Sequence, residues 1–184
     1  MANIVLLGSS YISRLERYTG GMFKVPGFVS FLGKGGMRTD TVPDCFMQCI
    51  AEIKPDIVII HLGGNDITCE SNATDIAISL LKLHDTILEI GAKEVFVGEI
   101  ITREPSQRHC PGLTKALFDV QRRKINTTIK KKLGKKLLRF KDITFPKDYD
   151  EDLVHLSSTS TKSVSRRSGM DKYFFTLRRV CFSV

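Results

Sequence analysis

The sequence lacks the features that mark membrane-spanning and secreted proteins. No apolar stretch approaches the ~18 residues that a membrane-spanning helix requires. Met1 leads almost directly into a strand-like apolar pattern, without the basic flank and cleavage site of a signal peptide. These absences predict an intracellular protein with no membrane span. The Asn-x-Thr triplets at Asn72 and Asn126 therefore carry no prediction of glycosylation.

The sequence also lacks paired cysteines. Its five cysteines are odd in number and scattered, and no two form a C-x-x-C motif. This pattern is typical of neither a disulfide framework nor a zinc site, so we expect free thiols and no bound metal. Cys45 and Cys49 lie four residues apart on a predicted helix, and we expect them to be core residues rather than metal ligands.

Acidic residues are missing from one long segment of a chain whose formal net charge is +8. Between Asp119 and Asp142 there is no Asp or Glu, while ten Lys and Arg residues lie within 122–141. The favoured interpretation is a solvated helix face, because no aromatic residue for base stacking appears in the segment before Phe140. The alternative is weak contact with nucleic acid or another polyanion.

Linkers, repeats and low-complexity tracts are absent as well. The 184 residues are about the length of one domain, and 42% hydrophobic with 26% charged residues is typical of a globular protein. We therefore expect one domain over residues 1–184. The polar run 157–169 predicts a mobile loop.

What the chain does contain is an alternation of short apolar runs and segments with helical periodicity. The apolar runs predict buried strands, and the periodic segments predict helices, the first of them directly after Ser9. The predicted strands cover 3–8, 28–33, 56–63, 94–100 and, more weakly, 136–140; the later predicted helices cover 39–53, 72–90, 113–132 and 169–181. Alternation of this kind favours a three-layer α/β/α sandwich around a parallel, flavodoxin-like sheet of about five strands.

Polar and glycine-rich motifs follow the first three predicted strands. They are Gly8-Ser9-Ser10, "GKGG" at 33–36 and "GGND" at 63–66. Because the carboxyl ends of parallel strands meet at one edge of a sheet, we expect the three motifs to lie together. Taken singly, each has an ordinary structural explanation as a helix cap or a turn, and the same holds for "DLVH" at 152–155.

Together and in this order, the motifs resemble those of the SGNH hydrolases, also called the GDSL esterases and lipases. The resemblance extends from residue 3 to about residue 180. "GSS" stands where the family has Gly-Asp-Ser, so Ser10 takes the nucleophile position and Ser9 replaces the family's aspartate. "GGND" matches the Gly-x-Asn-Asp block, and "DLVHLS" matches the Asp-x-x-His block near the carboxyl terminus. In the less exact glycine block we assign Gly36, which directly precedes "MRT".

The resemblance implies a serine esterase that uses a Ser10-His155-Asp152 triad and no cofactor. A serine hydroxyl needs a neighbouring base, and the unperturbed pKa of a histidine, near ~6.5, suits that role. Three residues apart on one helical turn, Asp152 and His155 can lie on the same side. The backbone amides of Ser10 and Gly36 and the side-chain amide of Asn65 would form the oxyanion hole. We expect glycine at 36 because a side chain would crowd the acyl group.

The resemblance leaves two classes of function open. The first is hydrolysis of a carboxylic ester, with acetyl or another short acyl group on a small molecule or other acylated substrate. The second is a binding or assembly module, non-catalytic or with accessory esterase activity, as in related domains of animal retroelement proteins. It would contact nucleic acid through residues 122–141. Arg103, after the fourth predicted strand, lies at the same edge and is a candidate contact for an anionic substrate. His61 is expected to be a core histidine. The sequence favours neither a monomer nor an oligomer.

Overall fold

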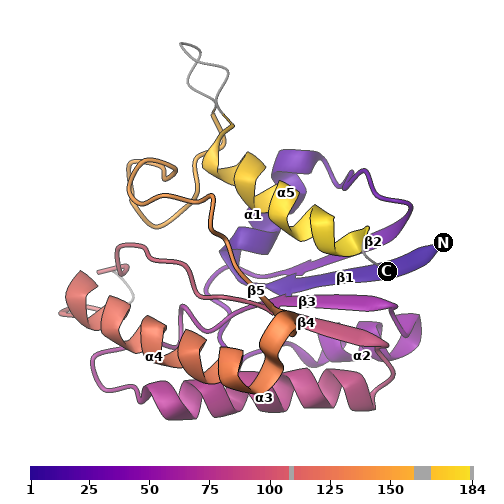
Figure 1. The fold of residues 1–184 in the computed structure, drawn as a ribbon, viewed down its shortest axis with the longest axis horizontal. Helices are drawn as coiled ribbons and strands as arrows, with labels where there is room; N and C mark the ends of the chain where they lie inside the picture. The colour runs from indigo at the N-terminus through magenta and orange to yellow at the C-terminus, as the bar shows by residue number, and fades with distance from the viewer. Residues whose placement is uncertain (108–109, 160–166, 183–184) are drawn as a thin grey trace.

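The computed structural model describes residues 1–107, 110–159 and 167–182. In this part of the chain, all strands belong to one five-stranded parallel sheet with the order β2-β1-β3-β4-β5 (Figure 1). The strands are β1 (Ala2–Gly8), β2 (Gly27–Gly33), β3 (Ile57–His61), β4 (Glu94–Gly98) and β5 (Leu137–Leu138). All five predicted strands are present, although β5 is shorter than the predicted 136–140.

Helices cover both faces of this sheet (Figure 1). On one side lie α1 (Ser10–Thr19) and α5 (Gly169–Cys181), which belong to one hydrophobic cluster. On the other side lie α2 (Asp44–Ile53), α3 (Ala73–Glu89) and α4 (Lys115–Leu133), which form a second cluster; a short 3₁₀ turn, η1 (Gly134–Lys136), leads into β5. The predicted three-layer α/β/α sandwich with a flavodoxin-like sheet is confirmed.

The two hydrophobic clusters follow from the alternation of side chains along each strand. In β1, Val5 and Leu7 join the cluster beneath α2, α3 and α4, whereas Ile4 and Leu6 join the cluster beneath α1 and α5. All four side chains are at most 1% exposed. Successive side chains of a strand point to opposite faces, so a strand covered on both faces must be apolar at every position.

Helix boundaries follow local capping, with one difference from the sequence prediction. The side chain of Asn72 accepts a hydrogen bond from the Thr74 amide and begins α3, close to the predicted start of that helix. In contrast, α2 begins at Asp44 rather than at residue 39, with Pro43 in extended backbone at its N-cap. The preceding Thr39 instead bonds to Asp66 in the loop after β3.

The expectation that both Cys45 and Cys49 are core residues is wrong for Cys45. Cys49 is half-buried and packs against the core, but Cys45 is exposed. The apolar stripe of α2 runs through Phe46, Ile50 and Ile53, and Cys45 lies about one residue's rotation away from it. All five thiols are free.

The structure describes only part of the predicted loop 157–169. Residues 160–166 of the predicted mobile loop lie outside that part. None of the helices in the described ranges is long and apolar enough to cross a membrane.

Candidate active site

Ser10 lies at the sharp turn that joins β1 to α1. A Cβ atom at Gly8 would lie 2.6 Å from the Ile12 side chain and 2.7 Å from the His61 carbonyl oxygen, so the turn requires glycine at this position. Ser9 is the N-cap residue, and its carbonyl accepts the Ile12 amide at 3.1 Å, although its side chain makes no capping bond. The first residue of the helix is Ser10, whose side chain is thus positioned by backbone geometry.

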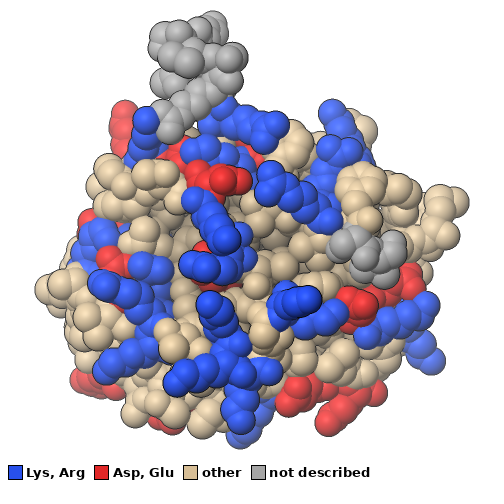
Figure 2. Space-filling model, in the orientation of Figure 1, with Lys and Arg blue, Asp and Glu red and all other residues tan. Residues whose placement is uncertain are grey.

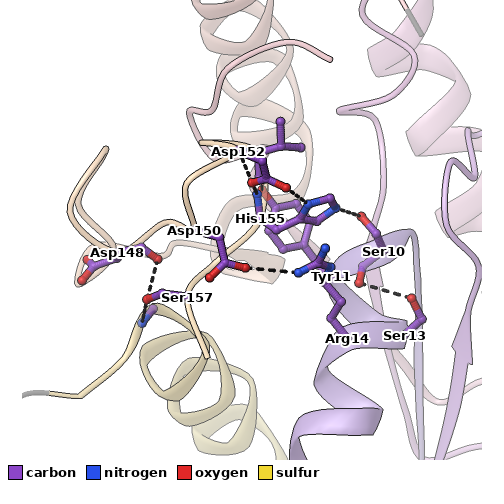
Figure 3. A network of polar contacts seen from close by, with 11 residues as sticks. Ser10, Tyr11, Ser13, Arg14, Asp148, Asp150, Asp152, His155 and Ser157 are labelled. Carbon is purple, nitrogen blue, oxygen red and sulfur yellow. Dashed lines mark hydrogen bonds and ion pairs between the residues drawn. The ribbon is translucent and has the colours of Figure 1, made fainter. Parts of the chain in front are cut away.

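The structure brings Ser10, His155 and Asp152 together, although 145 positions in the sequence separate Ser10 from His155. The Oγ atom of Ser10 lies 3.2 Å from Nε2 of His155, and Nδ1 of His155 lies 2.6 Å from Oδ2 of Asp152 (Figure 3). With an ionised Asp152 accepting the Nδ1 proton, the Nε2 lone pair faces the Ser10 hydroxyl. This is the hydrogen-bonding order that a serine nucleophile and its base require.

Asp152 is held in its charged form. Partial burial disfavours the charge, but hydrogen bonds from the His155 side chain and from the amides of His155 and Val154 outweigh this effect and lower the pKa of Asp152 to about 2. The carboxylate is therefore ionised at neutral pH.

Asp152 and His155 do not lie on a helical turn, contrary to the sequence prediction. They lie in a non-helical turn in which Leu153 has a φ of 53°. Oδ1 of Asp152 accepts the amides of Val154 and His155, both at 2.9 Å, and these bonds close the turn. Short polar side chains commonly close turns in this way. Asp152 and His155 therefore lie on the same side, as predicted, but a non-helical turn places them there instead of a helix.

The segment from Asp148 to Ser157, here named the His155 loop, is tied to the rest of the protein by polar contacts (Figure 3). The loop closes on itself where the Ser157 amide donates to the Asp148 carbonyl at 2.9 Å. Lys172 of α5 forms an ion pair with the buried Asp148 carboxylate at 2.6 Å. From α1, Arg14 pairs with Asp150 at 3.2 Å. These contacts fix the loop against α1 and α5.

Tyr11 is a further contact to this loop that sequence reasoning did not identify. It is the residue after Ser10, and its hydroxyl donates to the carbonyl oxygen of Val154 at 2.7 Å. Burial raises the pKa of Tyr11 to about 12, which keeps the hydroxyl a donor. Its ring lies near the rings of both His61 and His155, with centroid distances of 5.2 and 6.4 Å. In the sequence, Tyr11 is one of several apolar residues on the buried face of a predicted helix. Nothing in that pattern indicates a hydrogen bond to a loop that is distant in the sequence.

Asn65 is oriented by bonds at both ends of its amide. Its Nδ2 donates to the Met37 carbonyl at 3.1 Å, and its Oδ1 accepts from the Arg103 guanidinium at 3.0 Å. The bond to Met37 uses one of the two Nδ2 protons, so the second is available to a ligand. Asn65, Gly36 and Ser10 all line one cleft of about 670 Å³, together with Asp152 and His155. All five residues predicted for the triad and oxyanion hole therefore meet at one site.

Backbone conformation gives a reason for glycine at position 36 in addition to the expected crowding of the acyl group, which stays a prediction. A Cβ atom there would face open space, so steric crowding by protein atoms is not the constraint. The backbone has a φ of 73°, a conformation that glycine adopts without strain. Nearby, Asp66 accepts hydrogen bonds from the amide and hydroxyl of Thr39 and joins the Gly36 loop to the Asn65 loop. Burial raises the pKa of the Asp66 carboxyl.

Arg103 faces the protein as much as the cleft. Its side chain is buried, donates to the Gly64 carbonyl at 2.9 Å and to Asn65, and lies over the Phe118 ring at 5.2 Å. These contacts make it a support for Asn65. Arg103 also lines the cleft, so the predicted contact with an anionic substrate stays a prediction. Within the described ranges, no cluster of three or more His, Cys, Asp or Glu could hold a metal ion.

His61 is a buried core histidine, as expected. Its Nδ1 lies 2.6 Å from the Tyr173 hydroxyl, and its Nε2 lies 3.2 Å from the Glu99 carbonyl oxygen. Burial lowers the pKa of His61 to about 4, so the ring is neutral at pH 7. Its backbone carbonyl accepts the Ser9 amide, which connects β3 to the turn before Ser10.

Comparison with solved structures gives full-length matches at low sequence identity. Est24, a carbohydrate acetylesterase from Sinorhizobium meliloti, matches with a TM-score of 0.74 and 15% identity over 100% of this chain and 99% of that chain. The aryl esterase of M. smegmatis matches with a TM-score of 0.72 and 14% identity, again over 100% and 99%. A GDSL-like lipase from Bacteroides thetaiotaomicron matches with a TM-score of 0.72 and 12% identity over 99% and 88%.

No protein-family model and no curated protein match the sequence. The structural matches nevertheless extend over the whole chain and define its class of fold. The protein has the fold of the GDSL, or SGNH, lipases and esterases, as the sequence motifs predicted.

Proposed function

We propose that this protein is a serine hydrolase of carboxylic esters, in which Ser10 is the nucleophile, His155 the general base and acid, and Asp152 the group that orients His155. The observation that carries the proposal is the hydrogen-bonded series from Ser10 through His155 to Asp152, with distances of 3.2 and 2.6 Å. The fold shared with solved esterases and lipases supports the same class of reaction.

In the first half of the reaction, Ser10 Oγ attacks the carbonyl carbon of the ester while its proton passes to Nε2 of His155. The resulting imidazolium is stabilised by the ionised Asp152 at Nδ1. When the tetrahedral intermediate collapses, the carbon–oxygen bond to the alcohol breaks, and His155 returns the proton to the departing oxygen. The product of this half is an acyl-Ser10 ester and a free alcohol.

In the second half, a water molecule replaces the alcohol. His155 removes a proton from the water as it attacks the acyl carbonyl, and the proton then returns to Ser10 Oγ as the acid leaves. In both halves the oxyanion would accept hydrogen bonds from the amides of Ser10 and Gly36 and from Nδ2 of Asn65. The amide of Ser10 is suited to this role because the first amides of a helix have no partner within the helix.

Labelling with a fluorophosphonate probe, followed by peptide mapping, tests the nucleophile directly. We expect one adduct, on Ser10, and loss of both labelling and ester hydrolysis in Ser10→Ala, with turnover reduced at least about a thousandfold. The variant should fold normally, because the bond of the Ser10 hydroxyl is to His155 and the N-cap is Ser9. Undiminished hydrolysis by Ser10→Ala would disprove the assignment.

Polyanion binding is a second candidate function, supported by the surface around α4. Figure 2 shows Lys and Arg side chains grouped over α4 and the turn that follows it. Arg122 is paired with Asp119, and Arg139 with Glu99. Within the described ranges, six lysines of this segment form no ion pair: Lys124, Lys130, Lys131, Lys132, Lys135 and Lys141. Their charge is available to an anionic partner.

Salt dependence separates this candidate from hydrolysis. If α4 binds nucleic acid, affinity for a labelled single-stranded oligonucleotide should fall steeply with salt, and replacing Lys130, Lys131 and Lys132 by Ala should flatten the log–log slope by about two. We expect only weak binding, and hydrolysis of a neutral ester that salt does not change. Tight, salt-sensitive binding without any esterase activity would favour the second function.

A further inference from the structure

The cleft in front of Ser10 continues into a second, more apolar pocket. This pocket has a volume of about 190 Å³ and shares Gly36, Asn65, Arg103, Pro105 and Ser106 with the cleft. Seven further residues line the pocket but not the cleft: Arg38, Gly64, Ile67, Thr68, Cys110, Leu113 and Phe118. Ile67, Leu113 and Phe118 are at most 2% exposed, so the wall is part of the packed core beneath α3 and α4.

The position of His155 determines which part of an ester would enter this pocket. His155 has to protonate the leaving oxygen, so the alcohol must lie on the His155 side of the carbonyl carbon. Asp152, Val154 and His155 line the cleft but not the pocket. The pocket opens instead beside Gly36 and Asn65, the proposed oxyanion donors. A substituent that extends away from His155, past these donors, is the acyl chain.

The size of the pocket sets the length of that chain. A cavity of about 150 Å³ lined by apolar side chains is large enough to hold benzene. The pocket of about 190 Å³ therefore exceeds what an acetyl group fills. The charged groups at its edge have partners, because Arg103 bonds to Gly64 and Asn65, and Arg38 forms an ion pair with Asp40 at 2.9 Å. These features favour a neutral, apolar acyl chain.

We infer that this pocket is the acyl-binding site and that it selects apolar acyl groups of about six carbons, or an aromatic ring of that size, over acetyl. The inference rests on the proposed function. It replaces the short acyl group expected from the sequence by a longer one, because buried core side chains of α4 and of the loops after β3 and β4 form the wall.

A chain-length series tests this inference. We expect kcat/KM for p-nitrophenyl esters to rise from acetate through butyrate to hexanoate, by up to about fourfold for each methylene that is fully buried and by at least about tenfold over the four methylenes. It should fall at decanoate, which is too long for the pocket. An acetate rate equal to or above the hexanoate rate would overturn the inference. In that case hydrolysis itself persists, so the proposed function survives.

A variant that fills the pocket tests whether the acyl chain binds there. Cys110 is half-buried at the wall, and Cys110→Phe should lower the ratio of hexanoate to acetate kcat/KM at least about tenfold. Cys45→Phe, at an exposed cysteine on α2, is the matched control and should leave the ratio unchanged. If Cys110→Phe does not fold, Ser106→Phe fills the same pocket from its shared edge.

The outcomes distinguish a wrong assignment of the acyl-binding pocket from the absence of hydrolase activity. A ratio that both pocket variants leave unchanged would show that the acyl chain lies elsewhere, whereas esterase activity would remain. Failure of the parent protein to hydrolyse any ester in the series, together with no fluorophosphonate adduct, would overturn the proposed function and with it this inference.

Discussion

The candidate active site consists of two parts that are held in place differently. Ser10, Gly36 and Asn65 lie within a few residues of the ends of β1, β2 and β3. Asp152 and His155 lie in the His155 loop, which has no regular secondary structure beyond one bridge between Tyr149 and Leu156. The first part is fixed by the sheet. The second is fixed by side-chain contacts and by single backbone bonds, such as that from the Glu104 amide to the Leu153 carbonyl at 2.9 Å.

The difference matters because the two kinds of support differ in strength. Parallel strand pairing along β1 and β3 sets the spacing of Ser10 and Asn65 through many backbone bonds. The His155 loop depends on a few individual contacts from Tyr11, Arg14 and Lys172. Loss of one such contact can shift His155 relative to Ser10, and even small misplacements of catalytic groups reduce rates strongly. Substitutions in the strand-end part should therefore affect chemistry directly, and substitutions at the loop contacts should affect it through position.

After Ser10→Ala, the largest expected effect is that of Asn65→Ala in the strand-end part. We expect kcat for an activated ester to fall about a hundredfold to a thousandfold with little change in KM, because the oxyanion bond strengthens in the transition state. Steady-state kinetics measure both constants. Asn72→Ala is the matched control, since it removes a helix cap that lines neither the cleft nor the pocket and should lower stability without lowering kcat. A change in KM alone would make Asn65 a binding residue.

The next effect concerns His61, which lies at the end of β3 and whose carbonyl accepts the Ser9 amide. Burial holds the pKa of His61 at about 4, below the ordinary 6.5, so the unfolded chain takes up this proton first as the pH falls. The contribution of neutral His61 to the free energy of unfolding is fully present above pH 6.5. It decreases by about 3 kcal/mol as the pH falls to 4. Urea unfolding at pH 7, 5 and 4 measures the loss. In His61→Gln, which does not titrate, the loss should be smaller by that amount; parallel curves for the two proteins would contradict the prediction.

The smallest expected effect is that of Tyr11→Phe at the loop contact. The substitution keeps the ring but leaves the Val154 carbonyl without its donor, which should lower the free energy of unfolding by about 1–2 kcal/mol. We expect kcat to fall about tenfold as the His155 loop shifts. Tyr18→Phe is the control, because the Tyr18 hydroxyl bonds to Asp171 at the surface and should affect neither quantity much. An unchanged kcat would show that other contacts alone hold the loop.

Much of the fold could be predicted from local patterns. The apolar runs identified all five strands because a strand covered on both faces is apolar throughout, as Ile4 to Leu7 illustrate. Capping residues such as Asn72 marked the helix starts. The start of α2 was predicted too early because residues 39–43 continue the helical pattern, whereas Thr39 bonds to Asp66 instead. That bond joins two loops distant in sequence, and no local pattern indicates it.

The sequence by itself determined the parallel α/β architecture and the types of residue at the candidate site, since strand ends bring Ser10, Gly36 and Asn65 to one edge. Only the tertiary structure decided how Asp152 and His155 reach Ser10, because a non-helical turn and contacts from Tyr11 and Arg14 position them. It also decided that Arg103 supports Asn65 and that a pocket of about 190 Å³ lies beside the cleft. Periodicity reports which face of an element is buried, whereas long-range side-chain contacts depend on how separate elements meet in space.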